Sequence, residues 1–462
     1  MPLSKKQINK ALKNSIKEGS AYSAMEGITS TYSTPFALAL GANNAEIGLL
    51  SSIPNLFITL TQPFAGKFIE KRSRKIICQT LSLIQRFIWL PIVLMPFFFG
   101  KVWLFITLVT LSYVTLSFAN TAWSSWIGNL VPENIRGKYF GKRNMIQGAF
   151  SFSSTLIAGW ILGFMNNLFG FSVIFFLAFT FGLVSYFYLT RIPDVSYKSK
   201  HDKGLSVLDI LKDFKKYSNF YPFTIHMSLL SFAVTISSPF FAVYMLSIMH
   251  VGYEWYAIVI ATEIFVKIFM QRYWGKLSDR FGDRTIMSLC NILIVFYPFF
   301  FLFVTNPYQL ILISIFSGIG WSGFDLTAFN YLLDVTPPEK RPSYIANYKF
   351  LVGISLFLGP LIGGLLSQYF SGVTFFWLSG LQILFLISFI LRGITTAYGI
   401  PKLKEVRAKK VLPVSNVFLK AFAVYPARGI THDLFFVQQK FEHIEKNIKR
   451  RFKNLKNFKE MI

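Results

Sequence analysis

The chain has 462 residues, of which 53% are hydrophobic, 18% are aromatic and only 15% are charged. Soluble domains seldom combine so many aromatic residues with so few charges, and several apolar runs exceed the roughly 18 residues that cross a bilayer. The formal net charge of +26 would indicate nucleic-acid binding in a soluble protein, but here the basic residues are divided among alternate loops. We therefore attribute the charge to membrane topology and expect no nucleic-acid partner.

The first 20 residues are basic, and their apolar residues are spaced by four: Ile8, Leu12 and Ile16. Ser4 and Gln7 are placed to form a capping box at the start of a helix. The pattern predicts a short amphipathic helix that lies on an anionic membrane surface. A partly ordered tail is the alternative.

Twelve apolar stretches follow, each long enough to cross a bilayer of about 30 Å as a helix. The expected spans are residues 21–41, 45–67, 76–100, 102–128, 144–167, 171–190, 221–248, 253–275, 285–305, 307–333, 344–369 and 372–392. The predicted fold is therefore an all-α membrane protein with one six-helix bundle over residues 21–190 and a second over residues 221–392.

The loops alternate in charge. Lysine and arginine occupy the N-terminal segment, every second loop and everything after residue 392, whereas the other loops contain none except Lys101. By the positive-inside rule, both termini are expected in the cytoplasm of a multi-pass protein of the cell membrane. The lipid bilayer is thus one expected partner.

Two polar segments lie outside the bundles. Residues 191–220 mix Lys and Asp with apolar residues, which predicts a cytoplasmic linker containing an amphipathic helix. Residues 393–462 form a basic tail whose apolar residues repeat at three-four spacing. The tail either docks on the membrane surface, packs as a short coiled coil or binds a partner.

A charged turn from Trp274 to Arg284 separates two apolar spans, and a weaker copy runs from Gly66 to Lys75, about 209 residues earlier. The alignment places Gly66 on Gly275, Glu70 on Asp279, Lys71 on Arg280 and Lys75 on Arg284. Further along, at an offset of about 205, Asn120 falls on Asp325 and Arg136 on Arg341. Such repeats imply two bundles related by a pseudo-symmetry axis, with a site between them.

The second turn resembles the G-x-x-x-D-R-x-G-x-R signature of the major facilitator superfamily of transporters. The first copy departs from it by Glu70 in place of Asp and by Ser73 in place of the second glycine. The glycines are expected to permit close helix contact at Gly275 and chain reversal at Gly282. Arg136 and Arg341 are placed to meet Glu70 and Asp279, so that, together with Arg280, these charges form a cytoplasmic gate.

Ionisable residues inside the expected spans are costly in hydrocarbon and so indicate function. Glu263 and Lys267 are four residues apart on one helix and can pair with each other. The resemblance implies that the first, fourth and tenth helices line the transport cavity, which makes Glu26 and Asp325 candidates for proton coupling. Glu263 is a third candidate, because its pair with Lys267 either faces the cavity and switches partner when a substrate or proton arrives or serves only to neutralise both charges.

Arg86 is expected to turn inward, where it either pairs with Glu26 or binds an anionic group. With Lys267 and Asn120 it is a candidate for substrate binding. Trp123 and Trp126 follow Asn120 on the fourth helix. They serve either packing or the binding of an apolar or cationic substrate.

No Walker loop, metal-ligand cluster, nucleophile elbow or dinucleotide fingerprint appears, so no cofactor and no enzymatic activity are expected. The leading hypothesis is a secondary transporter of a small organic solute that works by alternating access and is coupled to protons. Export and uptake both remain open. The alternative is a receptor or scaffold that does not transport and acts through its basic C-terminal tail.

Overall fold

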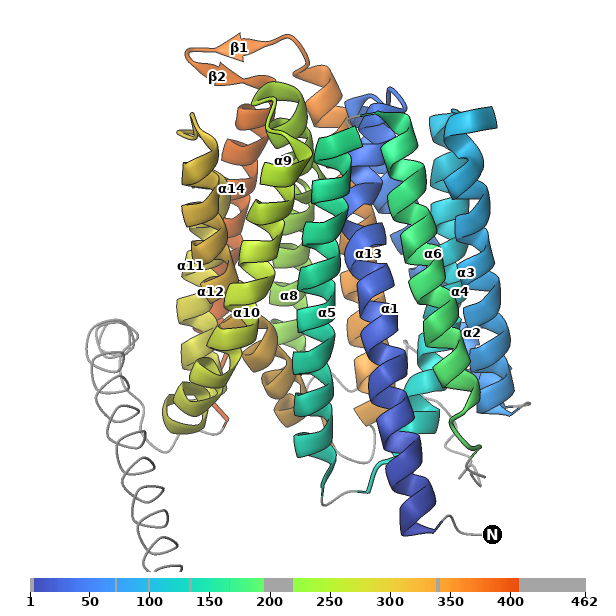
Figure 1. Cartoon of the computed structure of the whole chain (residues 1–462). Coiled ribbons are helices and arrows are strands. Elements are labelled where there is room, and N and C mark those ends of the chain that lie inside the picture. Colours follow the sequence, from blue (N-terminus) through green and yellow to red (C-terminus); the bar gives the residue numbers. More distant parts are fainter. Residues whose placement is uncertain are drawn as a thin grey trace, which may run out of the picture.

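A computed structural model describes residues 4–70, 73–98, 100–132, 135–165, 167–194, 219–337 and 341–406. Within these ranges the chain is almost entirely helical (Figure 1). The first elements are α1 (Lys5–Ala39), α2 (Asn44–Glu70), α3 (Arg74–Phe98), α4 (Val102–Leu130), α5 (Arg136–Met165) and α6 (Leu168–Thr190). They are followed by α8 (Phe220–Thr235), α9 (Ser238–Val243), η3 (Tyr244–Ile248), α10 (Tyr253–Phe281), α11 (Asp283–Phe300), α12 (Pro307–Val335), α13 (Arg341–Tyr369), β1 (Thr374–Phe375), β2 (Leu378–Ser379), α14 (Gly380–Gly399) and η5 (Ile400–Lys402).

In the described part of the chain, nine helices are long and apolar enough to cross a membrane. The expected spans in α1, α2 and α10 are not among them. The predicted linker helix within 191–220 and the predicted tail helix after residue 406 lie outside the described residues.

Helix α1 corrects the expectation of a separate surface helix, because residues 5–39 form one continuous helix. The predicted capping box is present: the Ser4 N–H donates to Gln7 Oε1 at 2.8 Å, and the Gln7 N–H donates to Ser4 Oγ at 3.3 Å. Ala11 and Leu12 are buried in a cluster with Trp126. The apolar face of this segment therefore packs against protein instead of a membrane surface.

The predicted span 221–248 is interrupted near its middle. Helix α8 ends at Thr235, α9 starts at Ser238, and η3 continues as a π-helix. Pro239 has no N–H to donate to the preceding turn, so a regular helix cannot run through this position. The full segment still satisfies the length and apolarity of a membrane span.

The last span begins later than the predicted residue 372 and ends later than residue 392. Residues 374–379 form a two-stranded hairpin instead, and α14 starts at Gly380 with a capping box between Ser379 and Gln382. The run of Thr, Phe and Trp in this hairpin favours strand over helix. Phe376 has a φ of 53°, which breaks any helix that would start before it.

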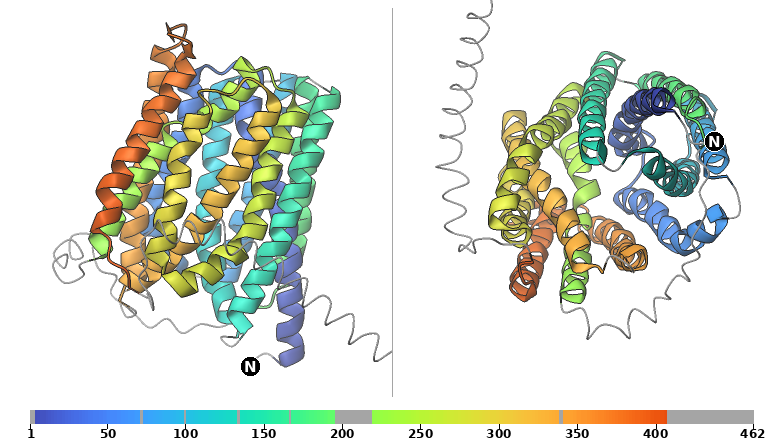
Figure 2. Two further views of the ribbon diagram at one scale, coloured as in Figure 1. Left: turned by 90° about the vertical axis from the view of Figure 1, so that its left-hand side faces the viewer. Right: turned by 90° about the horizontal axis from the view of Figure 1, so that it is seen from below.

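The helices pack as two groups, α1–α6 and α8–α14, which lie side by side in Figure 2. The groups meet chiefly through two pairs of helices, α2 with α13 and α5 with α10. We call the side of the molecule where α1 begins the N-terminal side and the other the far side.

Contacts between the groups gather toward the far side and the middle of the helices. A β-carbon added to Gly48 would lie 2.7 Å from the Cα of Gly364, so α2 and α13 touch backbone to backbone. The Tyr256 hydroxyl donates to the Thr31 carbonyl at 3.0 Å. No hydrogen bond or ring contact between described residues joins the groups at the N-terminal side. Among the described residues, the contacts between the groups therefore lie at the far side and in the middle of the helices.

Small residues make this close approach feasible, as they do between membrane helices generally. At Gly159 of α5, an added β-carbon would collide with the side chain of Ala257 in α10 and lie 2.7 Å from the Tyr32 hydroxyl. At Gly141 of the same helix, an added β-carbon would meet nothing within 4 Å.

These two glycines give a matched test of the contact. Alanine is favoured over glycine inside a helix by roughly 0.5–1 kcal/mol, so both substitutions carry the same local gain. We expect Gly141→Ala to keep or raise the melting temperature of the purified protein, and Gly159→Ala to lower it because α5 and α10 must separate. Equal melting temperatures for the two variants would contradict a tight contact at Gly159.

Candidate functional site

An ion pair occupies the middle of the second helix group. Lys267 lies at the midpoint of α10, and its Nζ is 3.1 Å from Oδ2 of Asp325 in α12. The Lys267 and Asp325 side chains are 37% and 53% exposed, so the pair lies outside the packed core. Lys267 was predicted to pair with Glu263, but the structure pairs it with Asp325. Glu263 is half-buried and has no ion-pair partner among the described residues.

Glu26 lies on α1 in the first group, where it lines a small cavity of about 20 Å³. Tyr113, Gln85 and Ser112 line the same cavity, and no lysine or arginine is among its lining residues. The Glu26 carboxylate has no ion-pair partner in the described part of the chain, and its side chain is exposed. It is thus a carboxylate that needs no rearrangement of an ion pair to change its protonation state.

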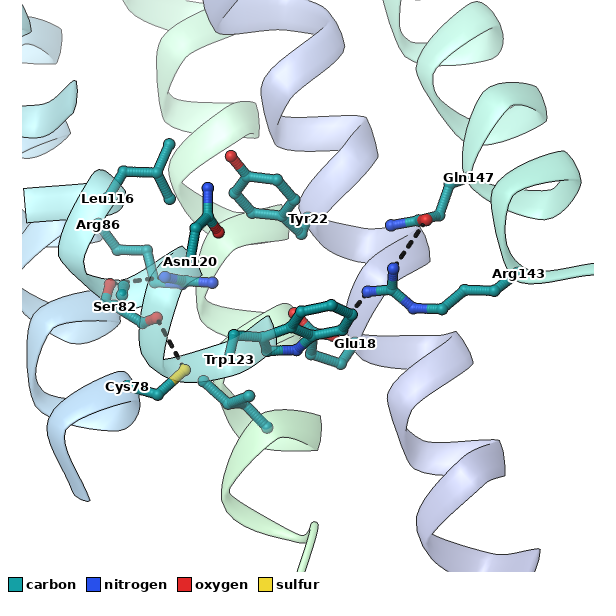
Figure 3. A pocket seen from close by; sticks show the side chains of 12 residues that line it. Glu18, Tyr22, Cys78, Ser82, Arg86, Leu116, Asn120, Trp123, Arg143 and Gln147 are labelled. Atoms are coloured by element: carbon teal, nitrogen blue, oxygen red, sulfur yellow. Dashed lines mark hydrogen bonds and ion pairs between the residues drawn. The ribbon is translucent and has the colours of Figure 1, made fainter. Parts of the chain in front are cut away.

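A second cavity, of about 120 Å³, lies inside the first group between α1, α3, α4 and α5 (Figure 3). Three ionisable side chains with opposite signs line it: Glu18, Arg86 and Arg143. Asn120 and Trp123 from α4 add an amide and an indole. Tyr22 lines both this cavity and the one beside Glu26, so the two spaces are neighbours.

Arg86 turns inward as predicted, and only 2% of it is exposed. Its Nε donates to the Gly182 carbonyl at 2.8 Å, its Nη1 to the Ser82 carbonyl at 2.6 Å and its Nη2 to Ser185 Oγ at 3.0 Å. The bonds to Gly182 and Ser185 connect α3 to α6. The hypothesised ion pair with Glu26 is absent: Arg86 has no carboxylate within ion-pair distance among the described residues.

Glu18 and Arg143 form a buried ion pair that sequence reasoning missed. Arg143 Nη2 lies 3.2 Å from Glu18 Oε2, and its Nη1 donates to Gln147 Oε1 at 3.0 Å. The guanidinium also stacks over the Trp123 ring, 4.3 Å from the ring centroid. Residue 143 was assigned to a loop and residue 18 to a surface helix. Continuous helical periodicity through both positions was the available signal.

The two tryptophans of α4 have different surroundings. Trp123 lines the larger cavity, where its indole lies against the Glu18 carboxylate. Trp126 is buried in the core, and its Nε1 donates to the Pro193 carbonyl at 3.1 Å. The structure therefore favours packing for Trp126 over the predicted contact with a substrate.

In the charged turn between α10 and α11, Gly282 adopts a φ of 90°, which confirms its role in chain reversal. Gly275 does not mark a close approach, because an added β-carbon would meet Leu326 only at 3.7 Å, an ordinary contact. Asp279 is exposed, whereas Asp283 is buried. Asp283 accepts hydrogen bonds from the Ser278 hydroxyl and, at 3.3 Å, from Asn330 Nδ2. Asp283 is thus the carboxylate that fixes the turn.

The arginines of the predicted gate bind carbonyl groups of their own helix group. Arg136 Nη2 donates to the Gly128 carbonyl and Arg341 Nη2 to the Leu333 carbonyl, each at 3.1 Å. Arg341 forms no ion pair with Asp279 among the described residues. Arg280 directly follows Asp279 on α10. The Glu70 side chain lies outside the described residues. The predicted gate at Asp279 is therefore not closed in this conformation.

The comparisons with known proteins agree with this fold. A family model for the Major Facilitator Superfamily matches residues 19–266 and 229–437. An uncharacterised MFS-type transporter of Methanocaldococcus jannaschii is 24% identical over 348 residues, which cover 72% of this chain and 85% of that protein. The multi-drug resistance efflux pump PmrA of Streptococcus pneumoniae is 26% identical over 165 residues, 36% of this chain and 40% of the pump.

Two solved structures have the same fold. The nucleoside transporter NupG superposes with a TM-score of 0.63 at 14% identity, over 86% of this chain and 98% of that one. A bacterial homologue of the human lysosomal transporter Spinster, in an inward-facing and unoccupied conformation, gives a TM-score of 0.66 at 15% identity, over 91% of this chain and 99% of that one.

The two carboxylates of the charged turn give a matched test of their roles. Asp283→Ala leaves the buried Ser278 hydroxyl and the half-buried Asn330 amide without their acceptor, so we expect the free energy of unfolding to fall by about 1–3 kcal/mol. Asp279→Ala removes an exposed carboxylate and is expected to change it by less than about 0.5 kcal/mol. Thermal and denaturant unfolding of the purified variants measures both, and a larger loss for Asp279→Ala would reverse the assignment.

Proposed function

We propose that this chain, which belongs to the Major Facilitator Superfamily, is a secondary transporter that moves a small organic solute by alternating access. It is a multi-pass integral protein of the cell membrane. The solved structures of the same fold are transporters, and two of the relatives are named as a transporter and an efflux pump. We further propose twelve membrane spans with both termini in the cytoplasm, because described basic residues beside the Lys/Arg-rich loops, among them Arg74, Arg136 and Arg284, lie on the N-terminal side of the molecule.

One observation carries this proposal: among the described residues, the contacts between the two helix groups lie at the far side and in the middle of the helices. With the termini in the cytoplasm, this conformation is inward-facing. Rocking about the contacts of α2 with α13 and of α5 with α10 would close the N-terminal side and open the far side. Asp279 and Arg341 both belong to the second group, so pairing them would also need a rearrangement within that group.

The charged residues of the two groups supply the coupling in this proposal. A half-exposed ion pair in the middle of membrane helices is costly against lipid, so Lys267 and Asp325 face the water-filled space between the groups. Lys267 can exchange Asp325 for Glu263, which lies one helical turn away on α10. A proton or a substrate that neutralises one carboxylate would shift Lys267 to the other.

Glu26 provides a proton-binding carboxylate on the opposite group. It has no cation partner among the described residues, so protonation breaks no ion pair. A change of charge at Glu26 alters the energy of exposing α1 to water in one conformation and of burying it in the other. This difference is what couples proton binding to a conformational equilibrium.

The names of the relatives suggest two starting probes, a cationic dye such as ethidium for a multidrug pump and a nucleoside such as uridine. No described contact favours the alternative of a scaffold that acts through its C-terminal tail, since residues 407–462 lie outside the described part of the chain.

The coupling claim is tested in proteoliposomes with a panel of labelled solutes that includes these two probes. We expect an imposed pH gradient to change the transport rate several-fold, and Glu26→Gln to abolish that dependence because the amide cannot bind a proton in this range. Glu46→Gln is the control: Glu46 accepts from the Asn43 N–H at the start of α2, a role that Gln can fill. A wild-type rate that ignores the gradient would contradict proton coupling.

A further inference from the structure

We propose that the cavity around Arg86 and Arg143 is a binding site for an organic anion, whose carboxylate or phosphate group is held by the Arg86 guanidinium. The proposal rests on the proposed transport function only in calling this anion the transported solute. The binding site itself follows from the charges, unused donors and free space inside the first helix group.

The cavity carries an uncompensated positive charge. Its ionisable lining consists of two guanidinium groups and one carboxylate, since Tyr22 and Cys78 are neutral at pH 7. Glu18 pairs with Arg143 at 3.2 Å and also acts electrostatically on Arg86, which forms no ion pair of its own among the described residues. One carboxylate thus serves two guanidinium groups, and one positive charge is left over. A buried charge without a partner is strongly unfavourable, so a ligand that supplies the missing negative charge gains that energy on binding.

Arg86 also has donors to offer. A guanidinium carries five N–H groups, and three of those of Arg86 are used by Gly182, Ser82 and Ser185. One hydrogen on Nη1 and one on Nη2 remain, and they form the fork that binds two oxygens of a carboxylate or phosphate. Figure 3 shows this guanidinium lying beside Asn120, whose amide provides a further donor.

The indole of Trp123 forms part of the wall of the same cavity. It lies against the Glu18 carboxylate, toward which its N–H is directed, so it positions that carboxylate beside the open space. The Arg143 guanidinium, stacked on the Trp123 ring, fixes the position of this indole. Leu116, Ala119 and Leu189 complete the lining with apolar surface. The site thus combines donors for an anionic head with an apolar wall for the body of the ligand.

Arg392 is a second buried arginine, and its hydrogen bonds serve as a comparison for those of Arg86. It is 1% exposed, and its three nitrogens donate four hydrogen bonds, to Ser388, Ile294, Val234 and Ser237. It lines neither of the two cavities of the first group. Arg86 makes one bond fewer and faces open space of about 120 Å³, many times what one water molecule needs.

Isothermal titration of the purified full-length protein tests the site, with benzoate and phenyl phosphate as anionic probes and benzamide as a neutral probe of the same shape as benzoate. We expect at least one anion to bind and benzamide not to bind. The comparison of benzoate with phenyl phosphate identifies the preferred head group. Arg86→Lys keeps the charge but loses the fork, so affinity for the preferred anion should fall about tenfold.

Two further variants separate binding from folding. Asn120→Asp places a carboxylate beside Arg86 and should abolish anion binding while Arg86 and its bonds to α6 remain. Arg392→Lys should lower the melting temperature and leave the affinity for the anion unchanged.

The site is contradicted if neither anion binds the wild-type protein at millimolar concentration, or if anions bind Arg86→Lys and Asn120→Asp as tightly as they bind wild type. Anion binding without transport of that anion would contradict the proposed function and leave the site standing. Transport of neutral solutes without any anion binding would support the proposed function and contradict the anion site.

Discussion

Charged groups in membrane-length helices must find their partners inside the protein, because hydrocarbon offers none. This constraint is met here in three ways. Arg392 is saturated by carbonyl and hydroxyl groups of neighbouring helices. Arg143 is neutralised by Glu18 in the core. Lys267 and Asp325 neutralise each other outside the packed core. Arg86 alone among these is deeply buried, lines a cavity and forms no ion pair between described residues, so it is the residue for which we propose a ligand.

The contacts between the helix groups obey a different rule. Where α2 crosses α13 and α5 crosses α10, glycines bring backbones together, and the interaction is dispersion between close surfaces with few hydrogen bonds. In the proposed alternating access, these contacts have no ion pair between described residues to break when the groups rotate. The same proposal requires each group to move as a unit, and the arginine hydrogen bonds within each group support that.

Much of the fold was predictable because apolar length and loop charge are strong signals in a membrane protein. The helix boundaries failed where a local effect overrode hydropathy. The charged start of α1 continues into the span because its apolar face finds Trp126 and the core around it. The start of α14 is set by the hairpin at residues 374–379. Neither packing partner nor strand pairing is visible in a window of one helix.

The candidate site was less predictable for the same reason. Residues such as Arg86 and Asp325 were identified because a charge within an apolar run is conspicuous, but their partners depend on how helices pack in three dimensions. Glu18 and Arg143 were missed because they stand at the ends of the expected spans, where a charge calls for no explanation. In the charged turn, the choice between Asp279 and Asp283 depends on which carboxylate is buried, and spacing in sequence does not decide it.

The internal repeat preserves the frame and not the interior. Arg136 and Arg341 each donate to a carbonyl eight residues earlier, that of Gly128 and that of Leu333. An acidic residue after the last helix of each group accepts a hydrogen bond from the start of the third helix. Asp194 accepts from the Ser73 hydroxyl, and Glu405 accepts from the Thr285 N–H. The corresponding positions Asn120 and Asp325 have diverged in charge. In the proposed transport, the positive cavity lies inside the first group, whereas the exchangeable pair Lys267–Asp325 lies outside the packed core of the second. The two groups therefore differ in where they hold their charges, although they share one helical frame.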